Sequence, residues 1–169
     1  KGVGALYIRN GVKLQSVAVG GGQEKDIRPG TEAMPNIAGF LGAVESLRVK
    51  DSLSEVTKLR DSFIEKLRRT EGITVNSPDD ALPYIVNLSL NKLNSETVLN
   101  FMSGMGIYVS SGSACSKGHK SPVLTAMGLS DEIINSSIRV SLSRYTTEEE
   151  LDAFVEASEK ALKTLAKRR

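Results

Sequence analysis

The single cysteine and the single histidine of this 169-residue chain lie four residues apart, at Cys115 and His119. Small residues precede the cysteine, and Lys117 and Lys120 stand on either side of the histidine. The thiolate is the reactive form of cysteine, and nearby cations lower the thiol pKa from its usual value near ~8.5. We interpret this segment as a loop that carries a nucleophile. A buried cysteine that acts as a small hydrophobic residue stays open as the alternative.

The composition limits the class of protein. A chain with 40% hydrophobic and 25% charged residues is long enough for one globular core. The net charge is +2, and only 167–169 is locally basic, so no nucleic-acid partner is expected. One cysteine cannot form an internal disulfide, which favours a cytoplasmic location. No apolar run reaches the roughly 18 residues of a membrane span, and no metal site is expected.

The first 31 residues look like the end of a preceding domain. Residues 3–9 and 12–19 favour two strands, joined by the hairpin turn Asn10-Gly11. Residues 20–31 are rich in glycine and form an irregular connection. Their amides could cradle an anion, but a simple connection is the favoured interpretation. Because the chain starts directly with a strand pattern and without methionine, we expect it to be part of a longer protein.

Residues 32–72 are predicted to form a helical connector. Pro35 suits the start of a first helix, and apolar residues recur at helical spacing after it. Asp51 or Ser52 is expected to cap a second helix, which Gly72 ends. Both apolar stripes are expected to lie in the core.

Residues 73–169 are predicted to form a small domain of the α/β class, with a sheet of three or four strands covered on one side by helices. Strands are expected at 73–75, 84–90, 107–109 and 137–142. Helices are expected at 95–102, 122–127, 131–134 and after the capping box of Thr147 and Glu150. Alternation along the last strand puts Ile138 and Val140 on one face and Arg139 on the other.

Several motifs, in this order, resemble the C-terminal part of the pyridoxal-phosphate-dependent cysteine desulfurases of the class-V aminotransferase family. They are KGVGALYIR, GGGQE with RPGT, SSGSAC, SPVLTAMGL and SIRVSLSRYTTEEE. The cysteine context is similar to that of the enzymes that supply iron-sulfur assembly. The resemblance implies the C-terminal domain of a fold-type I enzyme, preceded in residues 1–31 by remnant strands of the large cofactor-binding domain.

The resemblance also implies a reaction and three site residues. Cys115 matches the nucleophile that attacks the sulfur of L-cysteine, which leaves L-alanine and an enzyme persulfide. Arg139 matches the arginine that holds the substrate carboxylate; from the residues alone, a surface ion pair would be the favoured role. Thr31 matches a threonine that reaches the cofactor phosphate of the partner subunit, which implies a homodimer. A sulfur-acceptor or iron-sulfur scaffold protein is the expected protein partner.

The resemblance places the imine-forming lysine upstream of Lys1, outside this chain. We therefore expect the 169 residues alone to be inactive. Three alternatives stay open: a selenocysteine lyase, a cysteine sulfinate desulfinase, or a stand-alone module that carries a persulfide on Cys115. A carrier would need neither Arg139 nor Thr31, so these two residues favour the enzyme.

Overall fold

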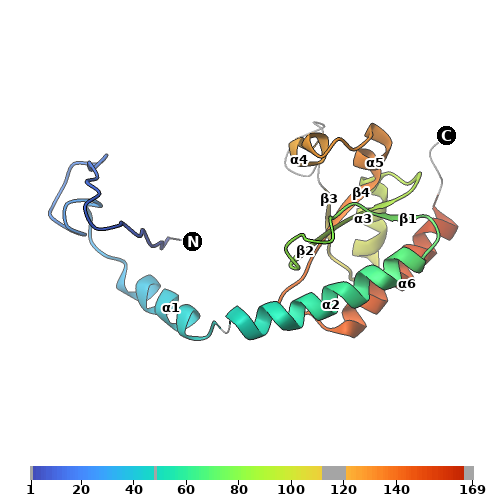
Figure 1. Cartoon of the computed structure of the whole chain (residues 1–169), viewed down its shortest axis with the longest axis horizontal. Helices are drawn as coiled ribbons and strands as arrows, with labels where there is room; N and C mark the ends of the chain where they lie inside the picture. Colours follow the sequence, from blue (N-terminus) through green and yellow to red (C-terminus); the bar gives the residue numbers. More distant parts are fainter. Residues whose placement is uncertain (1, 48, 112–120, 166–169) are drawn as a thin grey trace. The chain divides into compact units, whose positions relative to one another are not determined.

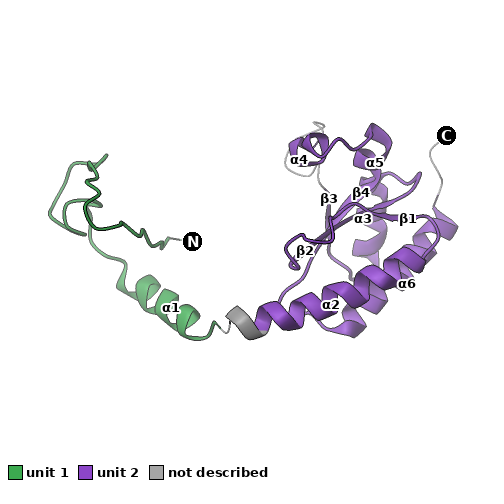
Figure 2. Ribbon diagram, viewed as in Figure 1, with its two compact units in different colours: residues 1–48 green, residues 49–169 purple. Residues whose placement is uncertain are grey.

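The computed structural model describes residues 2–47, 49–111 and 121–165; for residues 49–51 it describes the backbone alone. Two compact units make up the chain, residues 1–48 and residues 49–169 (Figure 2). The predicted division into domains at residues 31 and 72 stays a prediction. No helix among the described residues is long and apolar enough to cross a membrane.

Unit 1, residues 1–48, contains one helix and no strand among its described residues. The predicted turn at Asn10 and Gly11 is confirmed, since the Val12 amide donates to the Arg9 carbonyl at 3.1 Å and Gly11 has φ +86°. The two remnant strands on either side of it were predicted wrongly. An isolated two-stranded hairpin is only marginally stable in water, because a strand needs neighbouring strands to form hydrogen bonds with its backbone amides.

Helix α1, Met34–Glu45, follows in unit 1 and has Pro35 in its first turn, as predicted. Its apolar stripe was expected to be core, and that was wrong: none of the residues of α1 is buried. Phe40 is 39% exposed and Leu41 is 57% exposed. A stripe at helical spacing predicts the helix but not the surface that covers it.

Unit 2, residues 49–169, holds a four-stranded antiparallel sheet in the order β1-β2-β4-β3 (Figure 1). This confirms the predicted small sheet of the α/β class. The strands are β1 Ile73–Val75, β2 Ile85–Leu90, β3 Ser110–Ser111 and β4 Ser137–Ser141. The helices are α2 Val49–Arg69, α3 Ser95–Gly104, α4 Pro122–Ala126, α5 Asp131–Ser136 and α6 Glu148–Thr164.

The core lies between one face of this sheet and helices α2, α3 and α6. Alternation along β2 directs Val86, Leu88 and Leu90 into it, and all three are fully buried. Phe63 of α2 meets Phe154 of α6 edge to face, with ring centroids 5.6 Å apart. Such pairs contribute about 0.5–1.5 kcal/mol beyond the burial of their area. The apolar stripe of α2 is thus confirmed as core except for Leu53, which is 42% exposed, and α6 also buries its apolar face.

The start of α2 and the position of β3 differ from prediction. Helix α2 begins at Val49, before the expected cap at Asp51 or Ser52. The strand expected at 107–109 lies instead at Ser110–Ser111. Gly106, with φ +78°, ends α3, and the Ile107 amide donates back to the Met102 carbonyl at 2.9 Å. Because Ile107 completes the end of the helix, pairing with β4 starts three residues later.

Candidate functional site

The cysteine segment leaves β3 and returns at α4. Cys115, with Lys117, His119 and Lys120, lies outside the described residues, as does the basic end 167–169. The residues on either side are described: Ser111 pairs with Ile138 of β4, and Ser121 caps α4 by accepting from the Leu124 amide at 3.4 Å. Both serines are buried, at 8% and 7% exposure. The two residues that flank the segment are therefore part of the folded unit.

Arg139 lies in the middle of β4, between two strands. The register sets it opposite Asn87 of β2 on one side and Ser110 of β3 on the other. Residues directly opposite in an antiparallel pair have Cα atoms about 4.5–5.5 Å apart. Arg139 thus stands beside the last residues before the cysteine segment. The expected alternation is confirmed, because Ile138 and Val140 are buried and Arg139 is exposed.

The guanidinium of Arg139 has no hydrogen-bond or ion-pair partner among residues 2–47, 49–111 and 121–165. Other arginines in unit 2 are used structurally: Arg60 donates to the carbonyls of Asp79 and Ala81, and Arg68 pairs with Asp79 at 2.7 Å. The planar guanidinium offers parallel N–H groups that match a carboxylate. An exposed arginine on the polar side of the sheet is therefore available to bind an anion.

A polar network lies beside Arg139 on the same face of the sheet. Asn76 Nδ2 donates to Asn87 Oδ1 at 2.8 Å and to Ser89 Oγ at 2.9 Å. Ser89 Oγ in turn donates to the Ile133 carbonyl of α5 at 2.9 Å. Sequence reasoning missed these residues. The available signal was the alternation of polar residues with the apolar core positions of β2, where Asn87 and Ser89 occupy the other face.

Thr31 lies in unit 1, at the end of the glycine-rich segment. The loop before it is held by its own contacts: Gln23 Oε1 accepts from the Gly30 amide at 3.0 Å. A Cβ at Gly20 would stand 2.5 Å from Pro29 Cβ, so this close approach requires glycine. Thr31 is exposed, and its hydroxyl has no hydrogen-bond partner in the described part of the chain. Thr31 belongs to unit 1 and Arg139 to unit 2.

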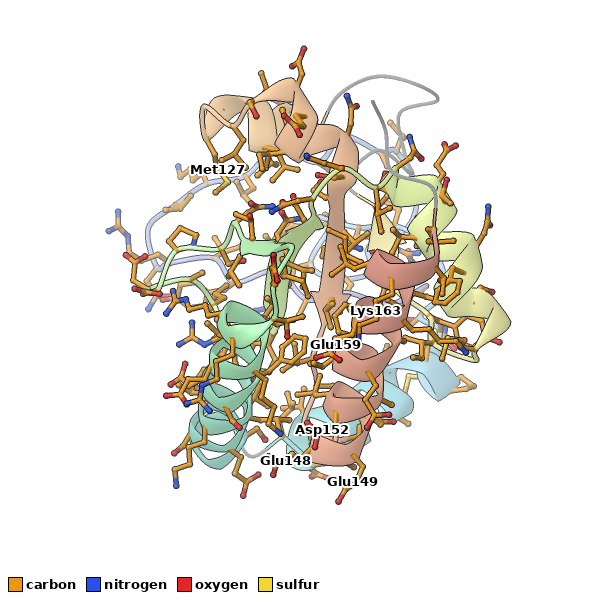
Figure 3. All side chains as sticks on the ribbon, turned by 90° about the vertical axis from the view of Figure 1, so that its right-hand side faces the viewer. Met127, Glu148, Glu149, Asp152, Glu159 and Lys163 are labelled. Atoms are coloured by element: carbon orange, nitrogen blue, oxygen red, sulfur yellow. The ribbon has the colours of Figure 1, made fainter. Side chains whose placement is uncertain are left out.

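The resolved pKa shifts lie away from Arg139, at the start of α6. Lys66 Nζ contacts Asp152 at 2.5 Å and Glu148 at 2.8 Å, and these hydrogen bonds raise the pKa of Lys66. Figure 3 shows both acidic residues on the first turns of α6. The pKa of Glu149 is lowered, chiefly by its own backbone amide and then by the Thr147 hydroxyl. These groups stabilise the helix start and take no part in the candidate site.

Comparison with known proteins matches residues 1–154 to the aminotransferase class-V family. Cysteine desulfurase IscS of Methanosarcina thermophila is 40% identical over 161 residues, which cover 92% of this chain and 40% of that protein. The mitochondrial cysteine desulfurase of Saccharomyces cerevisiae is 38% identical over 172 residues, which cover 98% of this chain and 34% of that protein.

Two solved structures share the fold. A NifS-like protein superimposes with a TM-score of 0.80 at 35% identity, covering 94% of this chain and 42% of its own. A NifS-like protein from Rickettsia africae superimposes with a TM-score of 0.75 at 32% identity, covering 91% of this chain and 41% of its own. The sequence resemblance is thus confirmed. The chain spans between a third and about two fifths of the length of these relatives.

Proposed function

The chain belongs to the aminotransferase class-V family, and from this we propose that it forms the sulfur-accepting part of a pyridoxal-phosphate-dependent cysteine desulfurase. In this proposal Cys115 takes the sulfur of L-cysteine and Arg139 holds the substrate carboxylate. The observation that carries it is the position of Arg139: exposed, without a partner among the described residues, and opposite Ser110, which leads into the cysteine segment.

Covalent geometry supports a shared site for these two residues. An extended chain advances at most about 3.6 Å per residue, so Cys115 lies within about 14 Å of Ser111 whatever its conformation. Ser110 and Arg139 are opposite one another across two paired strands. The long side chain of Arg139 and the thiol of Cys115 can therefore reach the two ends of one small amino acid, its carboxylate and its sulfur.

The reaction transfers one sulfur atom. The Cys115 thiolate attacks the substrate sulfur, so that an S–S bond forms while the substrate Cβ–S bond breaks. The electron pair of the broken bond stays with Cβ, which takes up a proton to give L-alanine, and Cys115 is left as a persulfide. When bound, pyridoxal phosphate supplies the electron sink for this step. Arg139 orients the substrate through its carboxylate, which presents the sulfur to Cys115.

The residues present fit the cofactor only in part. Thr31 offers an exposed hydroxyl as a donor to the cofactor phosphate, and we propose that it does so across a homodimer. In this proposal, the lysine that forms the imine with the cofactor lies in the longer polypeptide, outside these 169 residues. The chain alone is accordingly proposed to be inactive, and an absorbance band from a lysine-bound cofactor in the isolated chain would contradict this.

A sulfur-acceptor protein completes the proposed pathway. A persulfide on Cys115 must pass its outer sulfur to a second thiol, on an iron-sulfur scaffold or a thiolation protein. A cytoplasmic location agrees with this role, because a reducing compartment keeps the single cysteine free. Both the acceptor and the location stay predictions.

The test is made on the complete polypeptide that carries this chain, loaded with pyridoxal phosphate. Wild type should release alanine from L-cysteine, and Cys115→Ala should abolish this. Ser116→Ala is the matched control and should keep full activity. Arg139→Ala should raise the KM for L-cysteine about 10- to 100-fold, as expected for loss of a charged hydrogen bond. If Cys115→Ala still desulfurates L-cysteine, the nucleophile assignment fails; if it cleaves only selenocysteine or cysteine sulfinate, the alternative activities gain support.

A further inference from the structure

The hydrogen bonds beside Arg139 run in one direction only. The Ile133 carbonyl can only accept, so Ser89 must donate its hydroxyl proton to it. Ser89 Oγ then accepts from Asn76, which requires that the Asn76 amide present its NH2 group there. The same NH2 group reaches the side chain of Asn87 at 2.8 Å. The atom of Asn87 that receives this bond is therefore its oxygen.

This direction fixes the orientation of the Asn87 amide. With Oδ1 held by Asn76, the Nδ2 group of Asn87 is left over, and within the described part of the chain nothing accepts its protons. Arg139 is the cross-strand neighbour of Asn87 on the opposite side from Asn76, on the same face of the sheet. A second N–H donor, oriented by a backbone carbonyl of α5, thus belongs to the residue directly opposite Arg139.

We propose that Asn87 is a binding residue for the anion held by Arg139, and that its Nδ2 group donates a hydrogen bond to a carboxylate oxygen. This inference rests on the proposed function for the identity of the anion, the α-carboxylate of the substrate. A carboxylate accepts at both oxygens and has room for a donor besides the guanidinium fork. The network of Asn76, Ser89 and Ile133 prevents the amide from turning its oxygen toward the anion.

The substitution Asn87→Asp tests the donor specifically. Aspartate keeps an oxygen for the Asn76 hydrogen bond but replaces the NH2 group with a second, negatively charged oxygen. In the complete polypeptide the KM for L-cysteine should rise about 10- to 100-fold, with a smaller change in kcat, because the lost bond is to a charged group. A KM equal to that of wild type would overturn the inference.

Asn91→Asp is the matched control. Asn91 Oδ1 accepts from the Thr74 hydroxyl at 3.1 Å, so the same change keeps its bond and adds the same charge. Asn91 lies four residues beyond Asn87, roughly 13 Å along the strand direction. The Asn91→Asp substitution should therefore leave the KM for L-cysteine unchanged. An equal rise in both variants would assign the effect to charge alone and overturn the inference.

A second measurement on the 169-residue chain needs no cofactor. The side-chain NH2 resonance of Asn87 should shift saturably when propionate is added, and should not respond to propionamide or to chloride at equal ionic strength. The response should disappear in Arg139→Ala. A resonance that does not move with propionate overturns the inference. A shift here, together with a complete polypeptide that releases no alanine, would refute the proposed function and keep the carboxylate site.

Discussion

Helices α1 and α2 both carry apolar residues at helical spacing, but only α2 buries them. In α2, Phe63 is 1% exposed and Leu67 is fully buried, while in α1 Phe40 is 39% exposed and Leu41 is 57% exposed. Unit 2 supplies its own cover for α2 from the sheet and from α6. Among its described residues, unit 1 supplies none for α1. The comparison shows that helical periodicity reports which face is apolar, whereas burial depends on a second surface.

The largest expected difference comes from removing one phenylalanine in each unit. Phe63→Ala should lower the free energy of unfolding of unit 2 by about 3–5 kcal/mol, because it removes a buried ring and leaves a cavity. Phe40→Ala should change it by less than about 0.5 kcal/mol. The measurement is urea denaturation followed by the amide resonances of β2. Equal losses would contradict the exposed position of Phe40 in α1.

Gly72 of unit 2 and Gly11 of unit 1 have similar positive φ angles but different surroundings. Gly72 has φ +89° and a Cβ there would meet Leu162 Cδ2 at 3.1 Å, whereas Gly11 has φ +86° and open space around it. Gly72→Ala should destabilise unit 2 by about 1–2 kcal/mol through left-handed backbone strain. Gly11→Ala carries the same strain but should leave the unfolding of unit 2 unchanged. A loss from Gly11→Ala in the same denaturation experiment would contradict the assignment of Gly11 to a unit separate from unit 2.

The starts of α6 and α1 differ in capping. Thr147 and Glu150 form the predicted capping box, while α1 begins after Ala33 without a side-chain cap. Thr147→Ala should cost unit 2 about 1 kcal/mol in its free energy of unfolding. Ala33→Ser should raise the helicity of α1, measured by its Cα chemical shifts. An unchanged helicity of α1 would show that its start is not limited by the missing cap.

The smallest effect expected is a pH dependence confined to unit 2. Hydrogen bonds to Asp152 and Glu148 raise the pKa of Lys66 above 10.5. A raised lysine pKa stabilises the folded state fully below the unfolded-state value, and this contribution is lost as the pH rises through the folded-state pKa. The stability difference between wild type and Lys66→Met should therefore be constant at neutral pH and disappear in strong alkali. A difference that persists there would assign the effect of Lys66 to packing.

Local patterns in the sequence were sufficient for most elements of unit 2. The alternation around Arg139, the period of α6 and its capping box each depend on neighbouring residues, so they could be predicted without tertiary structure. The start of β3 could not be predicted in this way. Whether Ile107 ends the helix or joins the strand depends on which residues of β4 are available for pairing. The candidate residues Cys115, Arg139 and Thr31 came from motifs, and the structure describes two of them.

The sequence by itself predicted Cys115 as the nucleophile, showed the likeness to a family and placed Arg139 on the polar side of its strand, since these follow from motifs, residue types and short spacings. Only the tertiary structure decided that Arg139 lies between Asn87 and Ser110, residues 52 and 29 positions away in the chain. It also decided that Asn76 holds the oxygen of the Asn87 amide, through a chain of hydrogen bonds that ends on a carbonyl of α5. Strand register and hydrogen-bond direction are properties of paired segments, and no single segment of sequence contains them.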